Sequence, residues 1–166
     1  MNNVDLSGYL HRAPQIVRRA ALALLFTLTV GYTVGLRYLY ITSDFNATGV
    51  EENYLGNEED EEAEVMKFKM PEAKLLTIIH THILSYAFIF SLLTILLLIS
   101  GIHPKIKNFL ILEPFILVVL NFGLLYLLWM GCTWLGPVIM ITGIILTLSF
   151  YLSVILLTKD ILISKK

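Results

Sequence analysis

The sequence predicts an all-α integral membrane protein, a four-helix bundle whose spans run up-down-up-down. Of its 166 residues, 57% are hydrophobic, whereas soluble domains contain about 45–50%. The apolar residues form four long blocks instead of a stripe at helical spacing, and blocks of about 18 residues or more are typical of membrane spans. Because a helix satisfies its own backbone hydrogen bonds in lipid, each block is expected to be a helix.

We expect one transmembrane domain over residues 1–166, with a substantial loop at residues 41–72. The first block is interpreted as a retained span, because it lacks a small-x-small cleavage site and ends in Arg37-Tyr38-Leu39-Tyr40. Tyr32 is placed with these tyrosines near the end of that span, and Tyr38 and Tyr40 are expected at the headgroup level, which aromatic rings favour. The predicted spans are residues 16–40, 73–101, 108–130 and 134–158.

The basic residues predict the orientation of the bundle. Short loops rich in Lys and Arg stay in the cytoplasm. Both termini are therefore expected in the cytoplasm of a bacterial inner membrane, with the loop 41–72 in the periplasm. Eight basic residues precede span one, join spans two and three, or follow span four: Arg12, Arg18, Arg19, Lys105, Lys107, Lys159, Lys165 and Lys166.

The charge pattern and the cysteine count exclude other classes. No basic stripe with interleaved aromatic residues is present, which argues against nucleic-acid binding. Cys132 is the single cysteine, so the chain has no intrachain disulfide.

The two histidines of span two, His80 and His82, are the strongest candidates for chemistry. Imidazole is a ligand of haem iron, copper and zinc, and it titrates near neutral pH. Residues two apart on a helix point about 200° apart, so each histidine needs a different partner. We expect His80 and His82 to be metal ligands or cofactor-binding residues, with Arg37 and Tyr86 as further cofactor-binding residues. Haem b or a quinone is the cofactor considered, and hydrogen bonding within the bundle or proton transfer are the alternatives.

Polar residues inside the other spans have structural interpretations. Asn121 is expected to hydrogen-bond between helices. Glu113 is expected to form an ion pair near the cytoplasmic face, with a proton path as the alternative. Its candidate partners are Lys105, Lys107 and Lys159. The G-x-x-x-G at Gly31–Gly35 predicts a close helix contact, within the subunit or between subunits.

The loop 41–72 combines turn residues around Tyr54 with an acidic run at residues 58–64. Such a run is typical of a solvated segment. Binding of a divalent cation and docking of a basic partner, such as a periplasmic cytochrome, are the functional alternatives.

A series of short motifs begins in this loop and continues into span two. They are Gly49-Val50, Tyr54-Leu55-Gly56-Asn57, Met66-Lys67-Phe68, Leu75-Leu76 and His80-Thr81-His82. Over residues 49–85 the chain resembles a group of uncharacterised bacterial four-span proteins with the pattern G-V…Y-x-G-N…M-K-[FY]…L-L…H-x-H. The resemblance implies that the loop and the paired histidines form one unit, with Tyr54, Lys67, His80 and His82 together at the outer surface.

The predicted function is a non-catalytic membrane subunit or anchor of a larger, respiratory electron-transfer complex. Its partners would be the lipid bilayer and either other membrane subunits or a periplasmic cytochrome. The chain has no nucleophile with a base and no phosphate-binding loop, so we do not expect catalysis by the chain alone. The alternatives are a small haem- or quinone-binding oxidoreductase, or an accessory subunit of a transporter or channel. A homo-oligomer is also compatible with the sequence.

Overall fold

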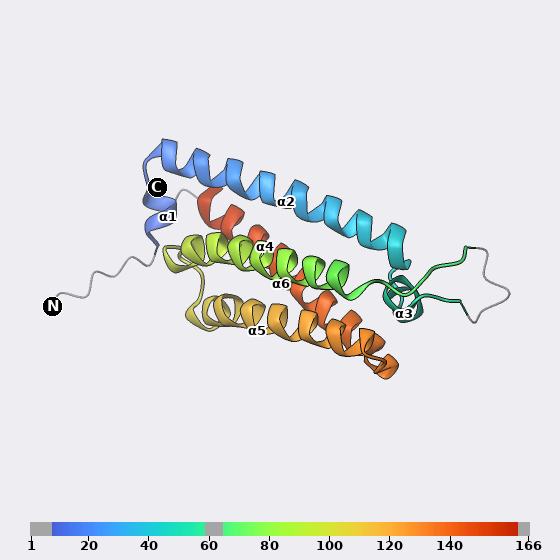
Figure 1. Ribbon diagram of the computed structural model, residues 1–166. Coiled ribbons are helices and arrows are strands. Elements are labelled where there is room, and N and C mark those ends of the chain that lie inside the picture. The colour runs from blue at the N-terminus through green and yellow to red at the C-terminus, as the bar shows by residue number, and fades with distance from the viewer. Residues whose placement is uncertain (1–7, 59–64, 163–166) are drawn as a thin grey trace.

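The computed structural model describes residues 8–58 and 65–162, and within these ranges it contains helices and no strand. Four helices are long and apolar enough to cross a membrane, and they alternate in direction along the bundle (Figure 1). They are α2 (Gln15–Ser43), α4 (Glu72–Leu98), α5 (Pro104–Trp129) and α6 (Gly136–Leu162). The prediction of an all-α, four-helix membrane bundle is confirmed.

Three short elements complete the fold: α1 (Tyr9–Arg12), α3 (Ala47–Leu55) and the 3₁₀ turn η1 (Thr133–Leu135). Both described chain ends and the α4–α5 turn lie at one end of the bundle, which we call the basic end (Figure 1). We call the opposite end the α3 end. The described basic residues at the basic end are Arg12, Arg18, Arg19, Lys105, Lys107 and Lys159. Residues 59–64, which include five of the acidic residues of the loop, and the terminal Lys165 and Lys166 lie outside the described residues.

Proline and backbone geometry set the helix limits. Pro14 and Pro71 directly precede α2 and α4, and Pro104 is the first residue of α5, where its missing N–H costs no hydrogen bond. Asp44 closes α2 in the left-handed conformation at φ 48°. Helix α2 therefore continues beyond its predicted end to Ser43, and part of the predicted loop 41–72 forms α3.

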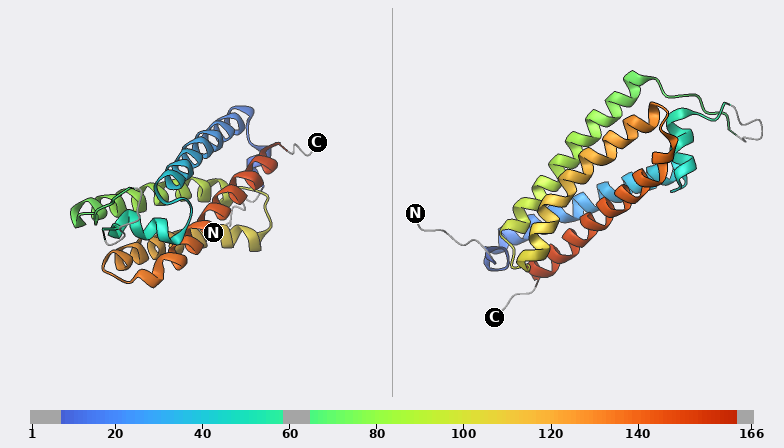
Figure 2. Two further views of the ribbon diagram at one scale, coloured as in Figure 1. Left: turned by 90° about the vertical axis from the view of Figure 1, so that its right-hand side faces the viewer. Right: turned by 90° about the horizontal axis from the view of Figure 1, so that it is seen from below.

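The four spans do not pack equally. Helices α4, α5 and α6 pack against one another, whereas α2 packs mainly on α6 and α3. Figure 2 shows α2 crossing the other spans obliquely. A Cβ added at Gly31 or Gly35 of α2 would meet no atom of another helix within 4 Å in the part of the chain that the structure describes. Packing of the G-x-x-x-G within the subunit is therefore wrong, and contact between subunits remains a prediction.

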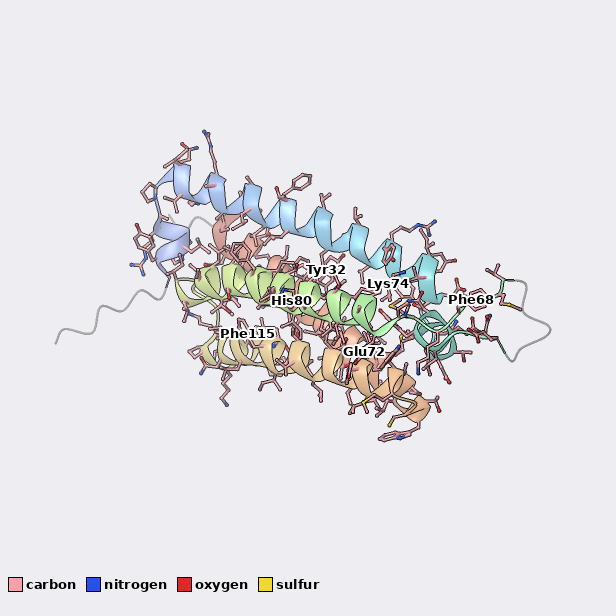
Figure 3. The ribbon with its side chains drawn as sticks, in the orientation of Figure 1. Tyr32, Phe68, Glu72, Lys74, His80 and Phe115 are labelled. Carbon is pink, nitrogen blue, oxygen red and sulfur yellow. The ribbon has the colours of Figure 1, made fainter. Side chains whose placement is uncertain are left out.

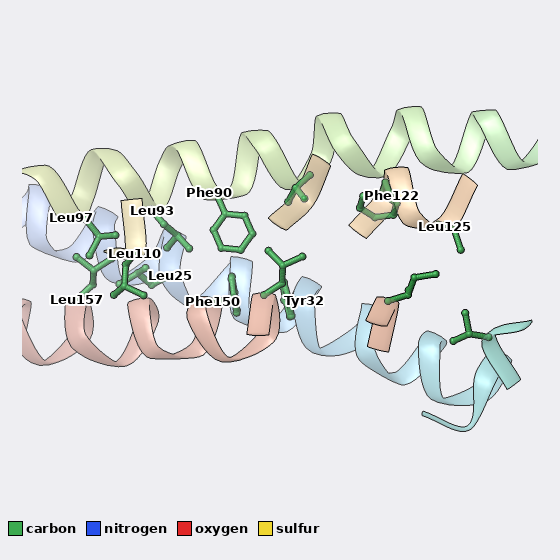
Figure 4. Close-up of a cluster of buried hydrophobic side chains, with 14 of the residues drawn as sticks. Leu25, Tyr32, Phe90, Leu93, Leu97, Leu110, Phe122, Leu125, Phe150 and Leu157 are labelled. Atoms are coloured by element: carbon green, nitrogen blue, oxygen red, sulfur yellow. The ribbon is translucent and has the colours of Figure 1, made fainter. Parts of the chain in front are cut away.

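The core is a continuous line of buried side chains (Figure 4). Leu93, Leu97 and Leu157 fill it toward the basic end, whereas aromatic rings fill its middle. Tyr32 stacks on Phe150, with ring centroids 4.0 Å apart. Tyr32 thus lies in the interior, toward the middle of α2 instead of near its end as predicted.

The basic end is closed by hydrogen bonds to helix C-termini. The N–H of Leu10, a fully buried residue of α1, donates to the Ile99 carbonyl at 3.0 Å. The Arg18 guanidinium donates to the Ile161 carbonyl at the end of α6. The Lys107 ammonium donates to the Ser100 carbonyl at 2.8 Å. Cations at helix C-termini satisfy carbonyls that have no partner within the helix.

Candidate functional site

Helix α3 and residues 65–71 form a folded unit at the α3 end, which we call the cap. The Asn46 side chain caps α3 by accepting from the Gly49 N–H at 2.6 Å. Gly49 lies against the end of α2, where an added Cβ would meet the Ser43 carbonyl oxygen at 2.2 Å. Gly56 has a positive φ of 86°, and an added Cβ there would meet Lys67 backbone at 2.7 Å. Both glycines are required by close backbone approach.

Asn57 holds the two segments of the cap together. Its side chain accepts from the Lys67 N–H at 2.6 Å and donates to the Val65 carbonyl at 3.0 Å. The Lys67 ammonium pairs with Glu52 of α3 at 3.2 Å. These contacts give the Y-x-G-N and M-K motifs a structural role in folding the cap.

The cap is fixed to the C-terminal end of α5, which lies at the α3 end of the bundle. Trp129 donates its indole N–H to the Met70 carbonyl at 2.7 Å, and the Lys69 ammonium lies 4.6 Å from the centre of the Trp129 ring. The Tyr126 hydroxyl donates to Glu72 at 2.9 Å. Burial raises the pKa of the Tyr54 phenol, so Tyr54 is neutral in the cap.

His82 and Tyr86 lie together in an aromatic cluster that joins all four spans. Their rings are 6.4 Å apart, and His82 also packs on Phe122 of α5 at 5.5 Å. Tyr86 meets the edge of Tyr32 at 6.0 Å, which links α4 to α2. The His82 Nδ1 lies 2.8 Å from the Ile78 carbonyl of its own helix. His82 therefore packs on the edge of the bundle, although its side chain, like that of His80, is exposed.

His80 lies on the opposite, outward side of α4. It is eight residues beyond Glu72, or about 12 Å along the helix. Figure 3 shows it farther into the bundle than Glu72 and Lys74, which stand at the α3 end. No hydrogen bond or ion pair joins its imidazole to any residue that the structure describes, and the side chain is exposed. His80 is thus available to a group outside the chain.

His80 is one of four exposed polar residues on the outer and lateral surface of α4, which we call the polar row, and the exposed apolar residues Leu84, Phe88 and Ile95 lie among them. Within residues 8–58 and 65–162, no hydrogen bond is made by the side chains of this row: His80, Thr81, Ser85 and Ser91, all exposed. Thr77 differs, because its hydroxyl donates to the Ala73 carbonyl at 2.8 Å. The outward face of α6 is aliphatic over the same depth, and carries Ile141, Ile144, Ile145, Leu148, Leu152 and Ile155.

Arg37 is separate from both histidines. Its guanidinium lies 5.1 Å above the Tyr40 ring of the same helix, and the residue is exposed. Of the four predicted cofactor-binding residues, the structure therefore brings His82 and Tyr86 together and leaves His80 and Arg37 apart. The cap contains Tyr54 and Lys67, but the histidines lie along α4.

Metal binding by His80 or His82 requires ligands from elsewhere. Among the described residues, no three His, Cys, Asp or Glu side chains lie close enough to hold one ion. One imidazole supplies at most one axial ligand of a haem, so the described residues alone do not complete a haem site.

Helix α5 carries two polar residues, and the predicted contact is formed by one of them and not by the other. Asn121 bridges to α6 as predicted, donating to the Ile139 carbonyl at 2.9 Å and to the Thr142 hydroxyl at 2.6 Å. Glu113 is also on the α6 side of α5, beside Ser149, but both its carboxyl oxygens are buried without a hydrogen bond. No ion pair of the described residues includes Glu113, so the predicted pair with a lysine is not formed there.

The comparisons with known proteins agree with this architecture. No curated protein and no solved structure matches the chain. Residues 44–166, which include the cap and the spans α4, α5 and α6, match a family described as a transmembrane helical domain. With about three quarters of its sequence matched, the chain belongs to this family, Aq_1264_TM.

Proposed function

We propose that the chain is a non-catalytic membrane subunit of a larger complex and that the outward face of α4 binds a membrane helix of a partner subunit. The polar row of His80, Thr81, Ser85 and Ser91 supports this proposal. Polar groups without partners cost several kcal/mol in hydrocarbon, and in membrane bundles they usually face another helix. The aliphatic face of α6 is, by contrast, suited to lipid.

The cap supports docking outside the membrane. It is fixed to α5 and presents three exposed apolar residues, Val65, Met66 and Phe68. Figure 3 shows Phe68 beyond α3, at the far end of the molecule from the termini. We infer that a periplasmic partner contacts this surface, with the basic end in the cytoplasm, because basic loops are retained there.

We further propose that the complex transfers electrons in a bacterial inner membrane. His80 is the one residue of the polar row whose side chain can ligate haem iron, and it can also hydrogen-bond a quinone. A haem between two copies of this chain, each contributing His80, is the second candidate. The exposed imidazole of His80 on the outward face supports this second candidate as well.

Cross-linking tests the α4 face. In a Cys132→Ser background, Thr81→Cys and Ser85→Cys place photoreactive maleimides on α4, and Ile144→Cys and Leu148→Cys place them on α6 as controls. In native membranes, the α4 positions should cross-link to one defined membrane protein, or to a second copy of the chain, whereas the α6 positions should not. Equal products from both helices would contradict the proposal.

Absorption spectra test the electron-transfer part. The complex isolated through the wild-type chain should contain haem or quinone, and His80→Ala should change the haem spectrum or the quinone content, whereas Thr81→Ala should not. A complex that contains neither cofactor would contradict electron transfer without affecting the docking proposal.

A further inference from the structure

The interface between α5 and α6 contains two polar layers, and only one of them has its polar group hydrogen-bonded. In the first layer, the Asn121 amide has two acceptors on α6, at 2.9 and 2.6 Å. The second layer lies eight residues nearer the basic end, about 12 Å along α5. There, the two oxygens of Glu113 are buried and neither has a hydrogen-bond partner. The same interface thus provides hydrogen-bond partners for the Asn121 amide but none for the Glu113 carboxyl group.

The surroundings of Glu113 contain no charge that would balance a carboxylate among the described residues. Ser149 of α6 provides the polar group beside the carboxyl, and it is buried, although the two groups do not meet hydrogen-bond geometry. On α4, the facing stretch from residue 87 to residue 100 has no titratable residue. On α5 itself, the nearest cation is Lys107, whose ammonium donates to the carbonyls of Leu98 and Ser100.

The titratable groups of α6 either bond to other groups or lie at the basic end. Tyr151 shares a hydrogen bond of 2.8 Å with Thr33 of α2. Lys159 and Asp160 lie at the basic end, where Asp160 accepts from the Gly101 N–H at 3.1 Å. Across residues 8–58 and 65–162, no ion pair includes Glu113.

Glu113 lies deep in the bilayer. It is nine residues beyond Pro104, about 14 Å along a helix that ends at Trp129, some 24 Å farther on. With a hydrocarbon core of about 30 Å, this position is inside the apolar region. An unpaired carboxylate costs several kcal/mol there. A neutral carboxylic acid avoids this cost, and a small rotation lets its O–H donate to the Ser149 hydroxyl.

We propose that Glu113 is a proton-binding site inside the membrane, with Ser149 as the acceptor of the carboxylic O–H and with proton exchange at the basic end. The basic end is the nearer of the two helix ends. In the other direction, the bonded Asn121 layer closes the interface. Ser153, one turn nearer the basic end on α6, is the next polar side chain, and its hydroxyl donates to the Ser149 carbonyl at 2.7 Å. The site is independent of the polar row on α4.

Dicyclohexylcarbodiimide tests the proposal, because this apolar reagent reacts with protonated carboxyl groups in membranes. The purified full chain in lipid nanodiscs should gain one reagent mass at Glu113, and the yield should fall as the pH is raised. A water-soluble carbodiimide with an amine should modify exposed acids such as Glu72 and should leave Glu113 intact. Glu113→Gln should abolish the labelling, whereas Glu72→Gln should not.

Infrared spectroscopy provides the second measurement, and it does not depend on reagent access. The wild type should show the carbonyl band of a protonated carboxylic acid that Glu113→Gln removes and Ser149→Ala shifts. A carboxylate band at neutral pH, or protection from labelling by sodium ions at constant pH, would overturn the proposal. The second result would indicate a metal cation in place of the proton.

The direction of exchange has its own test. In sealed vesicles with one orientation of the protein, the pH of each side is set separately, and labelling should follow the pH at the basic end. Labelling that follows the pH at the α3 end would overturn the assignment of the exchange route.

Discussion

Single residues decide whether the cap folds. Gly49 allows α3 to approach the last turn of α2, and Gly56 allows the chain to turn back at a positive φ. Asn57 then joins residues 65 and 67 through its side chain. The short motifs of the loop are therefore explained by backbone geometry, and they need no ligand to account for them.

Gly49→Ala tests this explanation. The added methyl group would lie 2.2 Å from the Ser43 carbonyl oxygen, so α3 must move, and the free energy of unfolding should fall by about 2–3 kcal/mol. Chemical denaturation in detergent, followed by circular dichroism, measures the change. Gly123→Ala is the matched control, because its added Cβ would meet no atom of another helix within 4 Å among the described residues, and it should cause no loss. Equal losses in both variants would contradict the close approach at Gly49.

At the scale of the element, the helix ends at the basic face depend on cations. Arg18 of α2 donates to a carbonyl at the end of α6, and Lys107 of α5 donates to a carbonyl just beyond the end of α4. These contacts tie α2 to α6 and α5 to α4. The basic residues predicted to set orientation thus also join neighbouring spans.

Lys107→Met should weaken the α4–α5 turn. The substitution keeps the length of the side chain but removes its donors to the carbonyls of Ser100 and Leu98, so the free energy of unfolding should fall by about 1.5–3 kcal/mol. Lys105→Met removes an exposed cation next to the same turn and should change stability by less than about 0.5 kcal/mol. The same denaturation experiment distinguishes the two variants. Equal losses of unfolding free energy would show that the charge alone, and not the hydrogen bonds of Lys107, stabilises the turn.

The sequence was sufficient to predict the four spans, but it was not sufficient to predict the contacts between them. Long apolar blocks predicted all four crossings, because hydrocarbon thickness sets the length of a span. Helix α3 escaped prediction because nine residues with Glu51 and Glu52 at their centre are helical through tertiary packing, with Val50 buried against the bundle. His82 packs on Tyr86, which lies four residues farther along the same face of α4. The outward direction of His80 depends on the rotation of α4, which spacing alone does not fix.

At the scale of the whole molecule, one aromatic cluster connects α2 to the packed helices α4, α5 and α6. Tyr32 of α2 touches Tyr86 of α4 and stacks on Phe150 of α6, and its hydroxyl lies 3.3 Å from that of Thr147. Tyr32 thus links α2 to the centre of the bundle, together with the buried Leu25.

Tyr32→Ala and Tyr32→Phe separate the ring from the hydroxyl. Loss of the ring should cost about 3–5 kcal/mol of unfolding free energy, as for other buried aromatic residues. Loss of the hydroxyl should cost about 1 kcal/mol or less, because Thr147 also donates to the Gly143 carbonyl. Unfolding in detergent measures both values. A larger loss for Tyr32→Phe than for Tyr32→Ala would contradict a stacking role.

The proposal that α4 binds a partner is tested most directly by the oxygen accessibility of a spin label. In a Cys132→Ser background, labels at Thr81→Cys on α4 and at Leu148→Cys on α6 should both be accessible to oxygen in the isolated protein in lipid. In native membranes that retain the partner, position 81 should become shielded and position 148 should stay exposed to lipid. If position 81 remains as accessible as position 148 in native membranes, the outward face of α4 meets lipid and the proposed subunit role is wrong.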